Sequence, residues 1–135
     1  AVEWSRLVRN VKRVYPYAKL AGRKINQYNE TLQPIKSRRE RDRMVKKFQD
    51  ELFAEFEGEL RNLTITQGKI LVKLIDRETG NPTYEVIHQY RGGIVAGFWQ
   101  LTGRIFGYNL KEPYDPNGKD KEIETIVRMI ENGLI

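Results

Sequence analysis

The stretch that decides the fold is WSRLVRNVKRVYPYAKLAGRKINQYNETL, residues 4–32. Its apolar and small residues recur at alternating intervals of three and four, the spacing of a seam along which one helix packs on another. We therefore predict a helix here, with a kink or a restart at Pro16, because proline removes one backbone donor. The seam comprises Trp4, Leu7, Val11, Val14, Ala18, Ala21, Ile25, Tyr28 and Leu32.

A second long helix is predicted after a turn at residues 33–35. Ser37 followed by Glu40 is a capping box that opens it. Because both helices are long and the connection is short, we expect an antiparallel hairpin whose two apolar stripes face each other. The second stripe comprises Met44, Val45, Phe48, Leu52, Phe56 and Leu60.

Shorter helices are predicted in the rest of the chain. In LTITQGKILVKLIDRETGN, residues 63–81, Thr64 and Gln67 form a capping box and Gly80 is a natural stop. A strand is the competing interpretation of KILVKLI, because the run is short and β-branched, but the cap and the glycine favour a helix. Further helices are expected near residues 82–91 and 119–132, the second after a turn at residues 114–118 and closed by Gly133.

The most apolar stretch, RGGIVAGFWQLTGRIFGYN at residues 91–109, holds five glycines. A helix to about residue 106 would have one bulky face, whose burial offsets the low helix propensity of glycine. Its other face would be nearly bare of large side chains. Either another backbone packs closely against this face, or a shallow groove remains there. The bulky face comprises Ile94, Val95, Phe98, Trp99, Leu101, Ile105 and Phe106, and the bare face Gly93, Ala96, Gly97, Gln100, Arg104 and Gly107.

These elements predict an all-α fold, in which a long helical hairpin packs against a glycine-rich central helix and two or three shorter ones. The chain has 135 residues, enough for one domain with a core, and we expect residues 1–135 to form a single helical domain. Because it has no cysteine, disulfides, thiolate metal sites and cysteine nucleophiles are excluded. No stretch has the 18 to 20 or so apolar residues that span a bilayer.

The net charge of +6 is unevenly distributed along the chain. Residues 1–50 hold 14 Lys and Arg against 5 Asp and Glu, whereas residues 51–135 hold 10 against 13. A basic half is typical of proteins that bind nucleic acid, anionic lipid or an acidic partner, and also of a merely solvated face. The candidate basic surface includes Arg9, Arg13, Arg38 and Arg41.

A second candidate site lies on the bare face of the glycine-rich helix. A buried arginine needs a carboxylate or several carbonyls, so we predict that Arg104 is at least half buried and pairs with an acidic residue. Asp76 is the first choice of partner and Glu85 the second. The alternative is an exposed Arg104 that lines a groove with Gln100 and binds an anionic ligand.

No cofactor or metal is predicted. His88 is the only histidine, so a transition-metal site has too few ligands. Asp115, Asn117 and Asp120 resemble a calcium loop, but the required glycine and glutamate are missing at its sixth and twelfth positions. No acid, base and nucleophile set indicates an enzyme.

Three segments resemble an uncharacterised bacterial family, catalogued as domain of unknown function 4294 and found mainly in Bacteroidetes. They are RLVRNVKRVYPYAKLAG at 6–22, LTITQGKILVKLIDRETG at 63–80 and FWQLTGRIFGYNLKEPYDPNGKD at 98–120. Members look like exported proteins, so the resemblance implies a cell-envelope location but no catalytic residue. We expect a non-catalytic binding or structural module whose partner is a protein or an anionic polymer. A nucleic-acid-binding domain is the first alternative and an enzyme of unidentified class the second.

Overall fold

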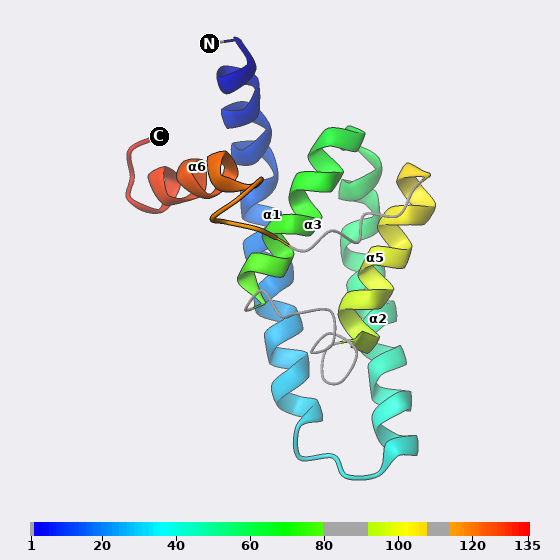
Figure 1. The fold of residues 1–135 in the computed structure, drawn as a ribbon. Helices are drawn as coiled ribbons and strands as arrows, with labels where there is room; N and C mark the ends of the chain where they lie inside the picture. Colours follow the sequence, from blue (N-terminus) through cyan, green and yellow to red (C-terminus); the bar gives the residue numbers. More distant parts are fainter. Residues whose placement is uncertain (1, 80–91, 108–113) are drawn as a thin grey trace.

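The computed structural model describes residues 2–79, 92–107 and 114–135 (Figure 1). Within these ranges it contains helices and no strand, which confirms the all-α class and the helical interpretation of residues 69–75. The predicted helix near residues 82–91 lies outside the described residues. The helices are α1 (Val2–Leu32), α2 (Arg38–Arg61), α3 (Ile65–Glu78), α5 (Gly92–Phe106) and α6 (Lys121–Glu131).

Helix α1 is continuous through Pro16, so of the predicted kink or restart the restart is wrong. Proline leaves the carbonyl four residues earlier, that of Lys12, without its helical donor. Both Pro16 and Lys12 lie on the exposed side of α1, where water can satisfy that carbonyl. The one missing helical hydrogen bond therefore lies on the solvent side of α1, where it disturbs the packing least.

Helices α1 and α2 form the predicted pair, joined by the turn at residues 33–37, but their stripes meet only along the C-terminal part of α1. There the rings of Tyr28 and Phe48 stack with centroids 4.2 Å apart, and Lys24 Nζ lies 2.8 Å from Glu55 Oε2. Farther from the turn, α1 packs most extensively against α3, while α2 packs against α5 (Figure 1). The two stripes are largely buried, as predicted, but they face each other only along the C-terminal part of α1.

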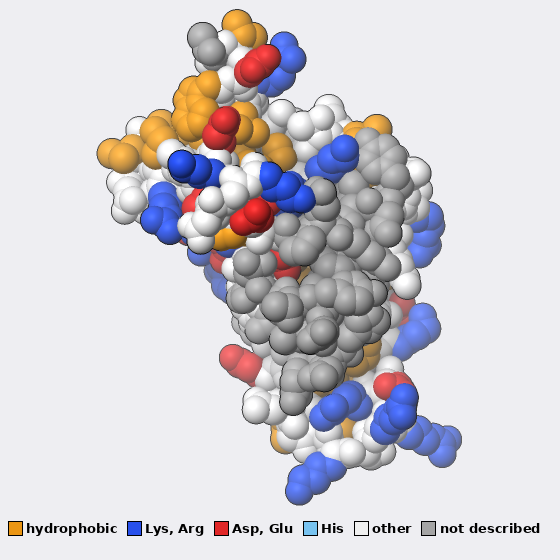
Figure 2. Space-filling view, viewed as in Figure 1, with side chains coloured by type: hydrophobic (Ala, Val, Ile, Leu, Met, Phe, Trp, Pro, Cys, Tyr) orange, Lys and Arg blue, Asp and Glu red, His pale blue; other side chains and the backbone are white. Residues whose placement is uncertain are grey.

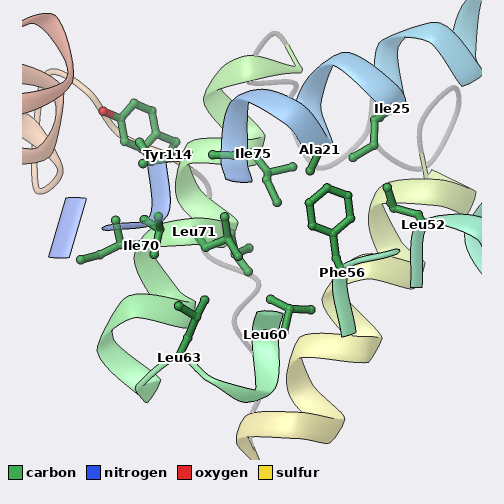
Figure 3. Close-up of a cluster of buried hydrophobic side chains, with 14 of the residues drawn as sticks. Ala21, Ile25, Leu52, Phe56, Leu60, Leu63, Ile70, Leu71, Ile75 and Tyr114 are labelled. Atoms are coloured by element: carbon green, nitrogen blue, oxygen red, sulfur yellow. The ribbon is translucent and has the colours of Figure 1, made fainter. Parts of the chain in front are cut away.

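The physical reason is that α3 has too much apolar surface for one neighbour to cover. Six of its residues from Gly68 to Ile75 are buried, and they occupy more than one side of the helix. Figure 3 shows Leu71 and Ile75 of α3 among side chains from α1 and α2, including Ala21 and Leu60. Burying such residues stabilises the fold by about 1.5–3 kcal/mol each. The apolar seam of α1 therefore packs mainly against α3.

Two glycines permit close contacts around α3. A Cβ on Gly22 would lie 2.5 Å from Cβ of Glu78, so α1 and α3 cross at a point where only glycine fits. A Cβ on Gly68 would lie 2.5 Å from Cε2 of Phe106, so the end of α5 rests on α3 there. Gly22 and Gly68 thus set how closely α1 and α5 approach α3.

The helix ends follow the sequence signals. The capping box of Thr64 and Gln67 is present in both directions, at 3.0 and 3.1 Å. Of the predicted box at Ser37 and Glu40, the described structure has one half: Ser37 Oγ accepts a hydrogen bond from the backbone N of Glu40 at 3.3 Å. Gly107 and Gly133, at the ends of α5 and α6, have φ of 84° and 72°, in the left-handed region that favours glycine.

The described part of α5 agrees with the predicted division into two faces. Ile94 and Leu101 are buried, whereas Gln100 and Arg104 are exposed. In the described ranges, no helix is both long and apolar enough to span a membrane.

Candidate functional site

The candidate basic residues are all exposed, but they lie in two separate places. Arg9 and Arg13 are on the N-terminal half of α1, and Arg38 and Arg41 are in the first turn of α2. At 1.5 Å per residue, about 35 Å of helix separates Arg9 from Leu32, where the turn to α2 begins. The structure therefore divides the predicted basic surface into two.

The denser of the two surfaces surrounds the turn between α1 and α2. We call it the hairpin end. Figure 2 shows Lys and Arg side chains around the lower part of the molecule, where Figure 1 places this turn. Over residues 36–50 its basic side chains outnumber acidic ones by seven to three. The hairpin end consists of the exposed residues Lys36, Arg38, Arg39, Arg41, Arg43, Lys46 and Lys47.

The charges of the hairpin end oppose the local helix dipole. The start of a helix favours acidic side chains, because its free N–H groups carry partial positive charge. Helix α2 instead begins with Arg38, Arg39 and Arg41, beside the single acid Glu40. Each misplaced cation costs about 0.3–1 kcal/mol at an exposed site. Helix stability therefore does not explain this cluster.

Most of these cations also have no acidic partner in the described structure. Lys46 Nζ lies 3.4 Å from Asp50 Oδ1, and Arg41 Nη2 donates to the carbonyl of Ile35 at 2.9 Å. No ion pair with a described residue occurs at Arg38, Arg39 or Arg43. Their guanidinium groups remain available to an external anion.

The predicted buried pair of Arg104 and Asp76 is wrong. Arg104 is exposed, like Gln100, because the bare face of α5 looks outward at these positions. Asp76 is 1% exposed, and its Oδ2 accepts a hydrogen bond from the backbone N of Tyr114 at 2.9 Å. The carboxylate is thus used to hold the segment that precedes α6. The other predicted partner, Glu85, lies outside the described residues.

The most connected polar group in the described structure is centred on Arg77. Its Nε and Nη2 donate to Oε1 and Oε2 of Glu124 at 2.8 and 3.3 Å. Nη1 and Nη2 also donate to Glu131 at 3.2 and 3.3 Å, and Nη1 donates to Glu78 at 3.2 Å. This guanidinium therefore ties the end of α3 to both ends of α6.

Two tyrosines extend the network to neighbouring segments. Tyr114 donates its hydroxyl proton to Glu124 at 2.8 Å, and Tyr15 of α1 donates to Glu131 at 3.0 Å. We call Tyr15, Arg77, Tyr114, Glu124 and Glu131 the α6 clamp. A second link is the ion pair of Lys73 with Asp120, whose Oδ2 also accepts from the backbone N of Asp115 at 2.9 Å. The resemblance to a calcium loop thus corresponds to a turn held by Lys73.

No sequence pattern singled out the α6 clamp, although one signal was present. Arg77 continues the line of Ile70 and Leu74 on α3, at intervals of four and three, where an apolar residue is expected. Glu124 and Glu131 lie seven residues apart and therefore share one edge of α6. A charge on an apolar stripe requires partners on the helix that covers it, but spacing alone does not identify that helix.

The environment of the α6 clamp shifts the pKa of its members. Burial alone would raise the pKa of Glu124, but hydrogen bonds from Arg77, Arg128 and Tyr114 outweigh it and lower the pKa to about 2. Burial and the bond to Glu131 raise the pKa of Tyr15 to about 12. For Tyr114, burial and the bond to Glu124 raise the pKa well above its usual range.

A model of the family described as Domain of unknown function (DUF4294) matches residues 1–129. The chain belongs to this family. The match spans the hairpin end and every residue of the α6 clamp except Glu131. No curated protein and no solved structure matches the chain.

The two groups of this DUF4294 chain differ in what they can do chemically. In the α6 clamp each carboxylate is bound to a cation or a phenol, and Glu124 stays ionised at neutral pH, which suits a structural tie. Among the described residues, no three His, Cys, Asp or Glu side chains gather as a metal site would require. His88 lies outside the described residues. The hairpin end, in contrast, presents guanidinium groups that have no acidic partner among the described residues and that match phosphate or carboxylate oxygens.

Proposed function

We propose that this chain is a non-catalytic binding module of the bacterial cell envelope, and that the hairpin end binds an anionic polymer. The observation that carries the proposal is the start of α2. Three arginines stand there against the helix dipole, and Arg38 and Arg39 have no acidic partner among the described residues. An arrangement that costs folding stability is typical of a surface kept for a ligand.

Several paired cations elsewhere on the described surface contrast with the hairpin end, although those of the first turns of α1 are also without an ion pair to a described residue. Several basic side chains elsewhere pair with an acid, such as Lys24 with Glu55 at 2.8 Å and Arg61 with Glu57 at 2.7 Å. Arginine rather than lysine predominates in the first turn of α2, and its planar fork binds phosphate or carboxylate through two parallel hydrogen bonds. A flexible chain carrying repeated anionic groups is the ligand that best fits such a convex, exposed cluster.

The non-catalytic part of the proposal is supported by the α6 clamp. Its carboxylates and phenols are engaged with each other and with Arg77, and the shifted pKa values of Glu124 and Tyr114 favour the forms that hold these bonds. A general acid or base that works near neutral pH would instead need a pKa shifted toward neutral pH. The envelope location is supported by the family resemblance of residues 6–22, 63–80 and 98–120, and fractionation of native cells tests it.

Binding of polyphosphate and heparin over a salt series tests the role of the hairpin end. The variant Arg38→Gln with Arg39→Gln removes two unpaired charges but leaves Arg41, whose bond to Ile35 supports the turn. We expect its affinity to fall about tenfold or more at low salt, with a shallower salt dependence, because fewer counterions are released. The matched control is Arg23→Gln with Lys121→Gln, which removes two exposed cations elsewhere.

Equal losses in the two double variants would contradict a defined site and indicate binding by net charge alone. Duplex DNA serves as the comparison ligand. Binding to DNA that selects among sequences and persists above about 200 mM salt would replace the proposal with a nucleic-acid-binding function.

A further inference from the structure

The N-terminal end of α1 carries apolar side chains that the rest of the fold leaves uncovered. Trp4 continues the seam of Leu7 and Val11 past the region where α3 and α6 cover α1. Burial falls along this line, since Val11 is fully buried, Leu7 is partly buried and Trp4 is 37% exposed. Val2, in the first turn of α1, is 70% exposed.

More apolar surface lies on the same side of the molecule. Leu134 and Ile135, which follow α6, are both exposed. Figure 2 shows hydrophobic side chains gathered at the upper left, over the first turns of α1 and over α6. Large apolar side chains gathered on one face mark a surface that contacts another molecule or a membrane.

Basic side chains accompany this apolar surface. Arg6, Arg9, Lys12 and Arg13 are all exposed, while Glu3 is the single acid among residues 2–13. None of these four cations forms an ion pair with a described residue. We call the exposed apolar residues and these four cations together the α1 tip.

The charge of the α1 tip decides which occupant fits it. A second copy would bring four cations against four, and like charges in an interface are strongly unfavourable. A bilayer with anionic headgroups satisfies both parts: tryptophan and aliphatic side chains enter the headgroup boundary, and arginine and lysine are attracted to its negative surface. No described helix can span the bilayer, so the contact would be with its surface.

We infer that the α1 tip docks the protein end-on on an anionic lipid membrane. Trp4 lies on one face of the first turns of α1, and Arg6 and Arg9 lie on the other side of the same turns. This inference uses residues other than the hairpin end, about 35 Å of helix away. It therefore stands or fails independently of polymer binding.

Co-flotation with vesicles tests the docking surface. One set contains phosphatidylcholine alone and the other adds phosphatidylglycerol. We expect binding to the anionic set only, lowered about fivefold by each of Arg6→Gln and Arg9→Gln, since a cation near such a surface contributes about 1 kcal/mol. Trp4→Ser should also lower it severalfold. The matched control is Leu20→Ser, because Leu20 is 39% exposed on the same helix but remote from the tip.

Tryptophan fluorescence places the contact. The chain has two tryptophans, so a Trp99→Phe protein with an unchanged circular dichroism spectrum reports on Trp4 alone. Its emission should shift to shorter wavelength with anionic vesicles and not with neutral ones. Equal loss of binding in Leu20→Ser and Trp4→Ser, or no emission shift, would overturn the inference. A dimer in analytical ultracentrifugation that Trp4→Ser dissociates would instead assign the tip to a second copy.

Discussion

Arg77 of α3 and Glu124 of α6 form a two-pronged ion pair, with Nε–Oε1 at 2.8 Å and Nη2–Oε2 at 3.3 Å. The two side chains are 21% and 11% exposed, so the pair is mostly shielded from water. Arg128 also donates to Glu124 at 2.8 Å, but its own side chain is 71% exposed. One carboxylate thus has a sheltered partner and an exposed one.

We expect Glu124→Gln to lower the free energy of unfolding by about 2–3 kcal/mol, because it leaves Arg77 with a missing partner in a sheltered place. This is below the 3–5 kcal/mol or so of a fully buried pair. Arg128→Gln removes the exposed partner of the same carboxylate and should cost less than about 1 kcal/mol. Urea unfolding measures both, and equal losses would show that the shielding of Arg77 is unimportant.

Stability should depend on acid pH through the α6 clamp. The pKa of Glu124 is lowered from 4.5 to about 2, and hydrogen bonds from Arg77 and Tyr15 outweigh burial and lower that of Glu131 also. A carboxylate with a depressed pKa in the folded state stabilises the fold above its unfolded pKa and loses this contribution as the pH falls. We expect thermal stability to fall between pH 4.5 and about 2, and to fall less steeply in Glu124→Gln.

The crossing of α1 and α3 should not tolerate a side chain at Gly22. A Cβ there would lie 2.5 Å from Cβ of Glu78, close to the backbone of α3. We expect Gly22→Ala to destabilise the fold by about 1–3 kcal/mol through overpacking. Gly58→Ala is the control, since a Cβ at Gly58 in α2 meets nothing within 4 Å. It should stabilise by about 0.5–1 kcal/mol through helix propensity, and a gain at Gly22 would refute the close crossing.

The start of α2 should show opposite effects on stability and binding. Arg38→Glu places an anion at the positive end of the helix dipole, so we expect a gain of about 0.3–1 kcal/mol in the free energy of unfolding and weaker binding of polyanions. Arg61→Glu makes the same change at the other end of α2, where the dipole is reversed, and should destabilise. Thermal denaturation and polyphosphate binding measure the two effects. Loss of stability in Arg38→Glu would remove the argument that the cluster serves a ligand.

Asp76 and Arg104 should behave independently of each other. Asp76→Asn weakens the acceptor for the backbone N of Tyr114 inside the protein, so we expect it to destabilise by about 1–3 kcal/mol. Arg104→Met changes an exposed side chain and should alter stability by less than about 0.5 kcal/mol. A double-mutant cycle should therefore give no coupling, whereas coupling above about 0.5 kcal/mol would restore the predicted pair.

The sequence by itself determined the helices of the described residues and most of their ends. Apolar spacing of three and four, the Thr64–Gln67 capping box, and glycines at 107 and 133 act within a few residues of the chain. Local backbone geometry and burial periodicity therefore suffice to specify them. The exposure of Arg38 and Arg41 also followed from sequence, because charged side chains are rarely buried.

Only the tertiary structure decided which helix covers which seam. By spacing alone, the apolar stripe of α1 fits α2 or α3 equally well. It packs mainly against α3, which has the larger apolar surface. The Arg77–Glu124 pair joins residues 47 positions apart, and the Tyr15–Glu131 bond joins residues 116 apart. Spacing along one helix shows that a charge at an apolar position needs a partner, but the partner is chosen by how the helices pack in space.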